Sequence, residues 1–98
     1  MREDIVSEER HQLLELARSY RRSQILLTCV ELEIFDILSH NPSNASNVAS
    51  LCGADSRGVE LLLNAATALG WLQKREGLFS NSPIAQRHLT SAWIGRFL

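Results

Sequence analysis

Apolar side chains recur at helical spacing through the first part of the chain. Leu13, Leu16 and Tyr20 follow one another at intervals of three and four residues, which places them on one side of a helix. We therefore expect a first helix over residues 8–22. No glycine or proline marks its end, so the sequence leaves open whether this helix continues into the next one; we place the end near residues 19–23, where polar residues cluster.

A second helix, expected over residues 24–39, carries apolar side chains on two sides. Ile25, Cys29 and Leu32 form one stripe at helical spacing. The residues of the other stripe are Leu26, Leu27, Val30, Ile34, Ile37 and Leu38. A helix that is apolar on two sides either lies at the centre of a core or is shared with a partner. We assign the larger stripe to the protein's own core and the smaller one to a partner.

The rest of the chain alternates short helices with turn signals. Glu76-Gly77 suits a hairpin turn, and Ser82-Pro83 suits the start of a helix. The remaining expected elements are helices over 47–52 and 57–69, a hairpin over 71–81, a helix over 83–89 and the start of another over 91–98. This order predicts a mainly α fold, a winged helix-turn-helix with a two-stranded β-hairpin wing, as a single domain over residues 1–98.

The composition is that of an ordinary globular domain. Of the 98 residues, 45% are hydrophobic and 21% are charged, and a chain of this length supports one modest core. Ten basic and eleven acidic residues give a net charge of −1, so no overall positive field attracts nucleic acid or anionic lipid. The longest apolar-rich stretch, residues 25–38, is too short and too charged to span a bilayer, so we expect no membrane partner.

The exposed side of the helix over residues 57–69 bears on nucleic-acid binding, because winged helices often bind DNA. Its polar residues are Arg57, Glu60, Asn64 and Thr67, and the wing adds Lys74, Arg75 and Glu76. This mixture of charges offers few phosphate contacts, and the electrostatic attraction is too weak for useful affinity at physiological salt. We therefore do not expect nucleic acid as a partner.

Residue types that carry chemistry are scattered along the chain. No two glycines are spaced as in a nucleotide-binding loop, and the histidines (His11, His40 and His88) are not paired with other ligands at metal-site spacing. We therefore expect no catalytic, cofactor-binding or metal-binding residue here. Cys29 and Cys52 are expected to be free thiols, which together with an N-terminus that lacks a signal-peptide pattern favours the cytoplasm.

Three segments together resemble a known family. They are the helix over residues 30–38 (VELEIFDIL), the helix over 58–63 (GVELLL) leading into 68–72 (ALGWL), and the end of the wing over 80–83 (SNSP). In this order and spacing, over about residues 13–89, the chain is similar to the N-terminal dimerisation domain of S-adenosylmethionine-dependent O-methyltransferases of the acetylserotonin and caffeic-acid type.

The resemblance implies a division of labour between two domains. In that family a larger C-terminal Rossmann-like domain binds S-adenosylmethionine and carries the base that deprotonates the acceptor hydroxyl. The N-terminal domain forms an intertwined homodimer and helps wall off the partner's substrate pocket. The resemblance therefore implies a homodimerisation module that is catalytically inert alone, with a small-molecule methyl acceptor in the full-length enzyme. Since the chain ends before such a donor-binding domain, we expect either a part of a longer enzyme or a stand-alone relative.

One position departs from the family pattern. The family commonly has glycine where Glu33 stands in this sequence. A charge at the edge of the apolar side suggests that this edge is wetter than usual, which would alter a partner interface without threatening the fold.

The apolar surface that a chain of this size cannot bury favours a two-fold dimer. The expected interface residues are Leu13, Leu16, Tyr20, Ile25, Cys29, Leu32, Trp93 and Phe97. Two other functions stay open. One is a small winged-helix DNA-binding transcription regulator, and the other is a stand-alone protein-interaction domain with no enzyme parent.

Overall fold

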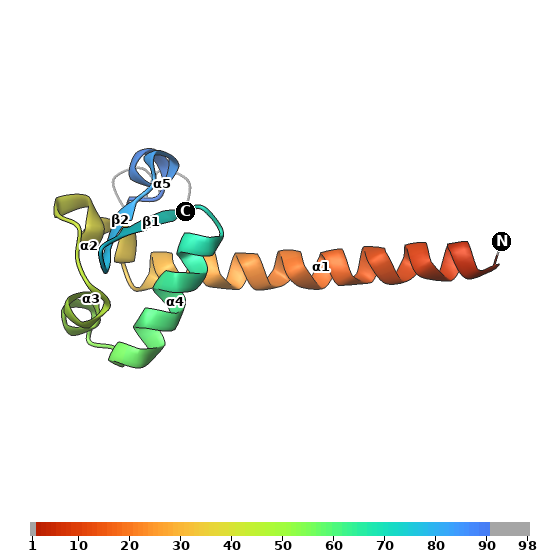
Figure 1. Cartoon of the computed structure of the whole chain (residues 1–98), viewed down its shortest axis with the longest axis horizontal. Coiled ribbons are helices and arrows are strands. Elements are labelled where there is room, and N and C mark those ends of the chain that lie inside the picture. The colour runs from red at the N-terminus through yellow and green to blue at the C-terminus, as the bar shows by residue number, and fades with distance from the viewer. Residues whose placement is uncertain (1, 91–98) are drawn as a thin grey trace.

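A long helix projects from a small body that holds all the other elements (Figure 1). The computed structural model describes residues 2–90, and side chains from residue 4 onward. The molecule measures 55 × 31 × 23 Å, and its radius of gyration is 16.4 Å. A compact chain of this length would have a radius of gyration of about 13 Å. The difference comes from the helix that projects into solvent.

This projecting helix, α1 (Arg2–Glu31), is continuous. The expected end near residues 19–23 is therefore wrong, and so are the boundaries 8–22 and 24–39. The polar residues clustered there lie on a part of α1 that is exposed to water, so they need no break in the helix to stay solvated. Polar residues such as arginine and serine continue a helix at little cost when no glycine or proline intervenes.

The real break lies between α1 and α2 (Ile34–His40), at Leu32 and Glu33. The Glu33 backbone has φ 59° and ψ 31°, the left-handed conformation. Its amide donates to the carbonyl of Val30 at 3.0 Å, which closes a tight turn. A left-handed residue other than glycine is strained by about 1 to 2 kcal/mol. Glycine adopts this conformation without that strain, so the backbone gives a physical reason for the glycine that the resemblance leads us to expect at this position.

The core lies where α2 meets the helix pair α3 (Ala45–Cys52) and α4 (Ser56–Ala68). Its fully or nearly fully buried apolar residues are Cys29, Ile34, Phe35, Leu38, Val48, Ala49, Val59, Leu63, Ala66, Leu72, Phe79 and Ala85. Val59, Leu63 and Ala66 form the buried side of α4. Leu27 was expected in this core but is half exposed. The break at Glu33 gives α1 and α2 different directions, so Leu27 does not share a side with the α2 residues of the predicted stripe.

Side-chain caps fix where α3 and α4 begin. Asn44 Oδ1 accepts from the amide of Asn47 at 2.8 Å, so α3 begins two residues before the expected start at residue 47. Asp55 Oδ2 accepts from the amide of Gly58 at 2.9 Å at the start of α4. Such caps satisfy amides that have no partner within the helix. Gly53, with φ 67°, ends α3 and makes the tight connection to α4.

The wing is an antiparallel hairpin of β1 (Leu72–Arg75) and β2 (Leu78–Asn81). Arg75 pairs with Leu78 across the two-residue turn of Glu76 and Gly77, which both have positive φ. Ser43 exchanges two backbone hydrogen bonds with Phe79, so the segment after α2 lies alongside β2 and pairs with it through an isolated antiparallel bridge.

The wing is anchored to the body at its far end. Asn81 Nδ2 donates to the carbonyl of Phe35 on α2 at 2.8 Å. Ser82 then caps α5 (Pro83–His88) by accepting from the amide of Ala85 at 3.2 Å. The element order confirms the predicted mainly α winged helix-turn-helix with a two-stranded hairpin. The helix expected over 91–98 lies outside the described residues.

Candidate functional site

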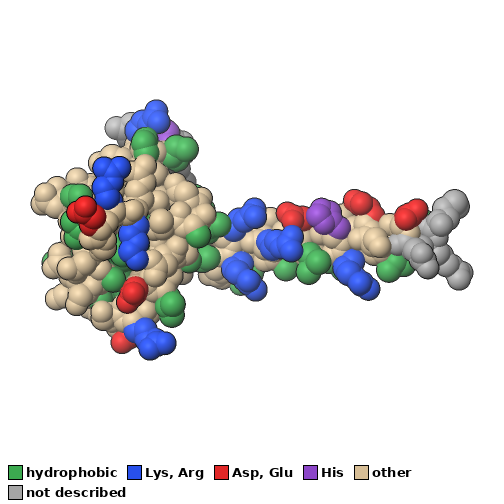
Figure 2. All heavy atoms as spheres, viewed as in Figure 1, with side chains coloured by type: hydrophobic (Ala, Val, Ile, Leu, Met, Phe, Trp, Pro, Cys, Tyr) green, Lys and Arg blue, Asp and Glu red, His purple; other side chains and the backbone are tan. Residues whose placement is uncertain are grey.

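Among the residues that the structure describes, an uncovered apolar surface runs along one side of α1. Its members are exposed by half or more of their surface, and they are Val6, Leu13, Leu16, Tyr20 and Leu27. We call these five residues the α1 stripe. Val6, Leu13, Tyr20 and Leu27 follow one another at seven-residue intervals, nearly two helical turns, so they share one side of α1. Figure 2 shows hydrophobic side chains along the lower edge of the projecting helix.

The α1 stripe lies on the side of α1 that faces away from the protein's own core. Cys29 follows Tyr20 by nine residues, about two and a half turns, so the two side chains point in opposite directions. Cys29 is completely buried, whereas Tyr20 is 67% exposed. The helix therefore uses one side to close the core of its own protomer. Nothing among the described residues covers the other side.

The expected interface residues separate into two groups. Leu13, Leu16 and Tyr20 lie on the α1 stripe, with exposed fractions of 68%, 69% and 67%. Ile25 and Leu32 are half-buried and pack against the protein's own core. The stripe that we assigned to a partner on the second helix therefore belongs largely to the protomer itself.

Cys29 is the clearest correction among these residues. It lies in the core of its own protomer, and burial raises the pKa of its thiol from 9.0 to about 12. A side chain with no exposed surface is not available to a second chain, so the assignment of Cys29 to the interface is wrong. Trp93 and Phe97 lie outside the described residues.

Two members of the α1 stripe were missed by sequence reasoning. Val6 precedes the expected helix start at residue 8, and Leu27 was given to the core. The seven-residue interval that joins both of them to Leu13 and Tyr20 was the available signal. It was hidden because the supposed break near residues 19–23 divided the pattern into two unrelated helices.

Charge is distributed unevenly along α1. Residues 4–15 carry the carboxylates of Asp4, Glu8, Glu9 and Glu15 and the cation Arg10. Residues 16–31 carry the cations Arg18, Arg21 and Arg22 and the carboxylate Glu31. The outer half is therefore acidic and the half nearer the body is basic, as Figure 2 shows. Arg18 pairs with Glu15 at 2.9 Å where the halves meet, an exposed pair of small energetic value.

The three arginines border an apolar cleft between α1 and α4. The cleft is lined by Arg18, Arg21, Arg22, Ile25, Ala65, Ala68 and Leu69. Arg21 also borders the shallow groove over the α1 stripe, together with Leu13, Leu16, Ala17, Tyr20 and Gln24. Arg21 therefore stands between the two surfaces and flanks the stripe with a positive charge.

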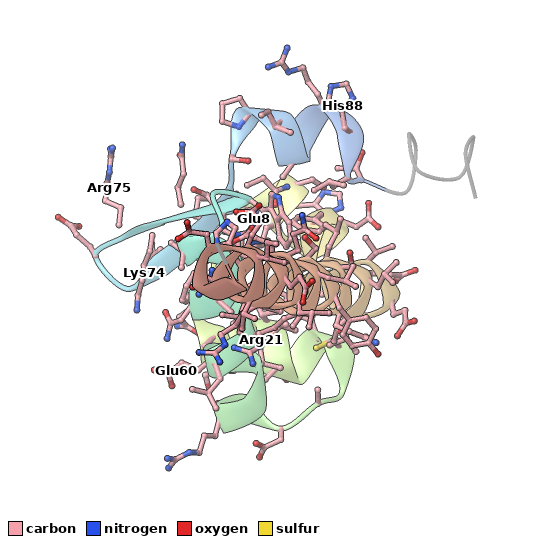
Figure 3. All side chains as sticks on the ribbon, turned by 90° about the vertical axis from the view of Figure 1, so that its right-hand side faces the viewer. Glu8, Arg21, Glu60, Lys74, Arg75 and His88 are labelled. Atoms are coloured by element: carbon pink, nitrogen blue, oxygen red, sulfur yellow. The ribbon has the colours of Figure 1, made fainter. Side chains whose placement is uncertain are left out.

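The surface of α4 and the wing has mixed charge. Lys74 Nζ donates to Asn64 Oδ1 at 3.3 Å and lies 5.0 Å from the centre of the Phe79 ring. The ammonium group of Lys74 therefore already interacts with side chains of its own protomer. Figure 3 shows Lys74 and Arg75 on the wing with Glu60 below them on α4. A surface that combines two cations with nearby carboxylates gives little electrostatic attraction for a phosphate backbone.

The described residues do not form a cradle for S-adenosylmethionine or for a metal ion. Within residues 2–90, the glycines with positive φ end helices or turn the wing, and none connects a parallel strand to a helix N-terminus. No group of three His, Cys, Asp or Glu among these residues could hold a metal. No helix in this part of the chain is long and apolar enough to cross a membrane.

Comparison with protein families matches residues 14–91 to the family described as "O-methyltransferase dimerisation domain". The human "Probable bifunctional dTTP/UTP pyrophosphatase/methyltransferase protein" is 38% identical over 81 residues, which cover 82% of this chain and 13% of that protein. Mouse acetylserotonin O-methyltransferase is 34% identical over 85 residues, which cover 81% of this chain and 22% of the mouse protein.

A similar domain is present in solved structures. Human N-acetylserotonin methyltransferase in complex with SAM superposes with a TM-score of 0.75 at 30% identity, over 83% of this chain and 25% of the human chain. This chain therefore spans a quarter or less of the length of these relatives. The family match covers most of the sequence and agrees with the winged-helix fold, and the chain belongs to the O-methyltransferase dimerisation domain family.

Proposed function

We propose that this chain is the homodimerisation module of an S-adenosylmethionine-dependent O-methyltransferase. In this proposal the α1 stripe is the surface that a second copy covers. The observation that carries the proposal is that five large apolar side chains lie exposed on one side of a projecting helix, opposite the side that packs on the core. Contiguous apolar surface of this kind marks interaction sites in soluble proteins.

A symmetric partner suits the α1 stripe because a two-fold axis uses the same surface twice. Covering the exposed part of a leucine such as Leu13 is worth roughly 1 to 2 kcal/mol, and each such contribution occurs twice in a dimer. Leu13, Leu16 and Tyr20 form the centre of the proposed interface. Ile25 and Leu32, which are half-buried and pack against the protein's own core, lie outside this centre.

The chemistry of methyl transfer would then reside outside residues 2–90. The glycines and strands described here do not fit the methyl donor, so we place donor binding and the catalytic base in a C-terminal Rossmann-like domain of the complete enzyme. This module would act by holding two protomers together and by helping to shape the partner's pocket for a small-molecule methyl acceptor. By itself it would be catalytically inert.

A cytoplasmic location agrees with this role. Both cysteines are free thiols, and Cys29 is sealed in the core rather than paired. Free cysteines are typical of a reducing compartment.

The test is the mass of the folded chain in solution. Size-exclusion chromatography with light scattering at tens of micromolar should give about twice the 11.0 kDa of one chain. A folded species with the mass of one chain at this concentration would contradict the proposal. Calorimetric titration with S-adenosylmethionine should show no binding heat, and appreciable binding would mean that donor recognition lies in this module.

A further inference from the structure

We infer that two copies of this chain pair their α1 helices in antiparallel order, with Glu9 of each copy beside Arg21 of the other. This inference rests on the proposed function, because it specifies how a second copy covers the α1 stripe. The stripe by itself does not select an orientation. The charges on and beside it do.

Glu9 interrupts the α1 stripe in the acidic half of the helix. It lies three residues after Val6 and four before Leu13, and therefore on the same side as both. A second helix that covers Val6 and Leu13 must also approach this carboxylate. Covering a carboxylate with apolar surface is unfavourable unless a cation meets it.

Arg21 supplies such a cation in the basic half of the helix. It borders the groove over Leu13 and Tyr20, so its guanidinium can reach a chain that lies on the stripe. Figure 3 looks along α1 and shows Arg21 and Glu8 on different sides of the helix. Glu8 is thus an acidic neighbour of Glu9 that points away from Arg21.

The order of pairing decides which charges meet. In a parallel pair related by a two-fold axis, Glu9 would meet its own copy, which repels, and the two Arg21 side chains would flank the same end of the pair. In an antiparallel pair with Leu13 opposite Tyr20, the axis passes between Leu16 and Ala17. Glu9 of one copy then lies within about one helical turn of Arg21 of the other.

The wider charge pattern of α1 favours the same order. The acidic residues 4–15 of one copy would lie along the basic residues 16–31 of the other, at both ends of the pair. A parallel order would place acidic beside acidic and basic beside basic. Juxtaposed like charges disfavour an association, so complementarity selects the orientation even where each exposed pair adds little affinity.

Charge reversal in the 98-residue chain tests this order. Glu9→Arg and Arg21→Glu should each weaken dimerisation by about tenfold at low salt, because each creates two repulsive contacts per dimer. The double variant should regain affinity to within about threefold of the original chain, because it exchanges the two charges. Glu8→Arg is the matched control, since it changes the net charge as Glu9→Arg does but points away from the stripe, and it should have little effect.

Distances between spin labels provide a second readout. Labels on Ser7→Cys and on Ser19→Cys, in a chain that also carries Cys52→Ser, avoid Cys29 because its thiol is buried. In the antiparallel pair the two labels at position 7 are about 28 Å apart along the axis, and those at position 19 about 8 Å apart. Circular dichroism of each variant is the check that its helices are kept.

The outcomes separate the inference from the proposed function. A dimer in which the single reversals have no effect, and in which both label positions give the same short distance, would be a parallel pair and would overturn the inference alone. A folded monomer would overturn the proposed function. A dimer that the single reversals weaken and the double reversal restores supports both.

Discussion

Replacing Leu16 by aspartate removes an apolar side chain from the centre of the α1 stripe without touching the core. Leu16 is 69% exposed in the protomer, so the change leaves the packing of the core unaltered. Full burial of a leucine is worth about 1.5 to 3 kcal/mol, and covering the exposed two-thirds of Leu16 roughly 1 to 2 kcal/mol. A dimer contains two copies, so the loss is roughly 2 to 4 kcal/mol.

This loss corresponds to a dimer dissociation constant that rises roughly 30- to 700-fold, since 1.4 kcal/mol is a factor of about ten. The introduced carboxylate would raise it further if it were covered. Sedimentation velocity over a concentration series measures the dissociation constant. Circular dichroism and thermal unfolding check that the protomer still folds.

Leu61→Asp is the matched control for Leu16→Asp. Leu61 is 64% exposed, also lies within a helix, and is on α4 outside the α1 stripe. Both changes lower helix propensity by the same amount, at most about 0.7 kcal/mol. If the two variants dimerise equally well, Leu16 contributes no more to dimerisation than an exposed leucine outside the stripe does. The assignment of the α1 stripe to a partner is then refuted.

Three further variants or measurements test the fold. Glu33→Gly should raise the free energy of unfolding by about 0.5 to 1 kcal/mol, because it relieves the left-handed strain but gives the unfolded chain more freedom; no gain in urea denaturation would contradict the conformational account. Asn81→Ala should lower the same quantity by about 1 to 2 kcal/mol, because the carbonyl of Phe35 loses its donor. A thiol reagent at neutral pH should modify Cys52 but spare Cys29 until denaturant is added, and equal reactivity of both thiols would contradict the burial of Cys29.

The same thiol gives the stability a pH dependence of definite sign. Burial raises the pKa of Cys29 from 9.0 to about 12, so the folded chain keeps a proton that the unfolded chain loses above pH 9. The contribution of the neutral thiol is therefore complete below about pH 9 and is lost as the pH rises toward 12. Urea denaturation at pH 8 and pH 10.5 should show this fall, and Cys29→Ala should reduce it.

Local chemistry made much of the fold predictable from the sequence. The helix start at Ser82-Pro83 and the turn at Glu76-Gly77 lie where the sequence predicted them. Each is a case in which one or two residues determine a backbone conformation regardless of distant contacts. The order of helices and hairpin followed from these positions.

The break after α1 was not predictable by the same means. Glu33 adopts a left-handed conformation that glutamate does not favour, and it is held there by the packing of α2 on the core. The cluster at residues 19–23 gave a false signal, because polar residues mark a loop and an exposed helix equally well. Misplacing the break changed the side of the helix assigned to Leu27 and Cys29. The side assigned to Leu13, Leu16 and Tyr20 did not depend on where the helix ends.

The central claim is that a second copy covers the α1 stripe, and amide hydrogen exchange along α1 measures this directly. Residues 6–24 of a lone protomer have few contacts outside the helix, so their amides should exchange fast when the chain is dilute. We predict that their protection rises with protein concentration, in step with the dimer population, while the amides of α4 change little. Amides in residues 6–24 that exchange equally fast at every concentration would show that nothing covers the stripe and would contradict the account.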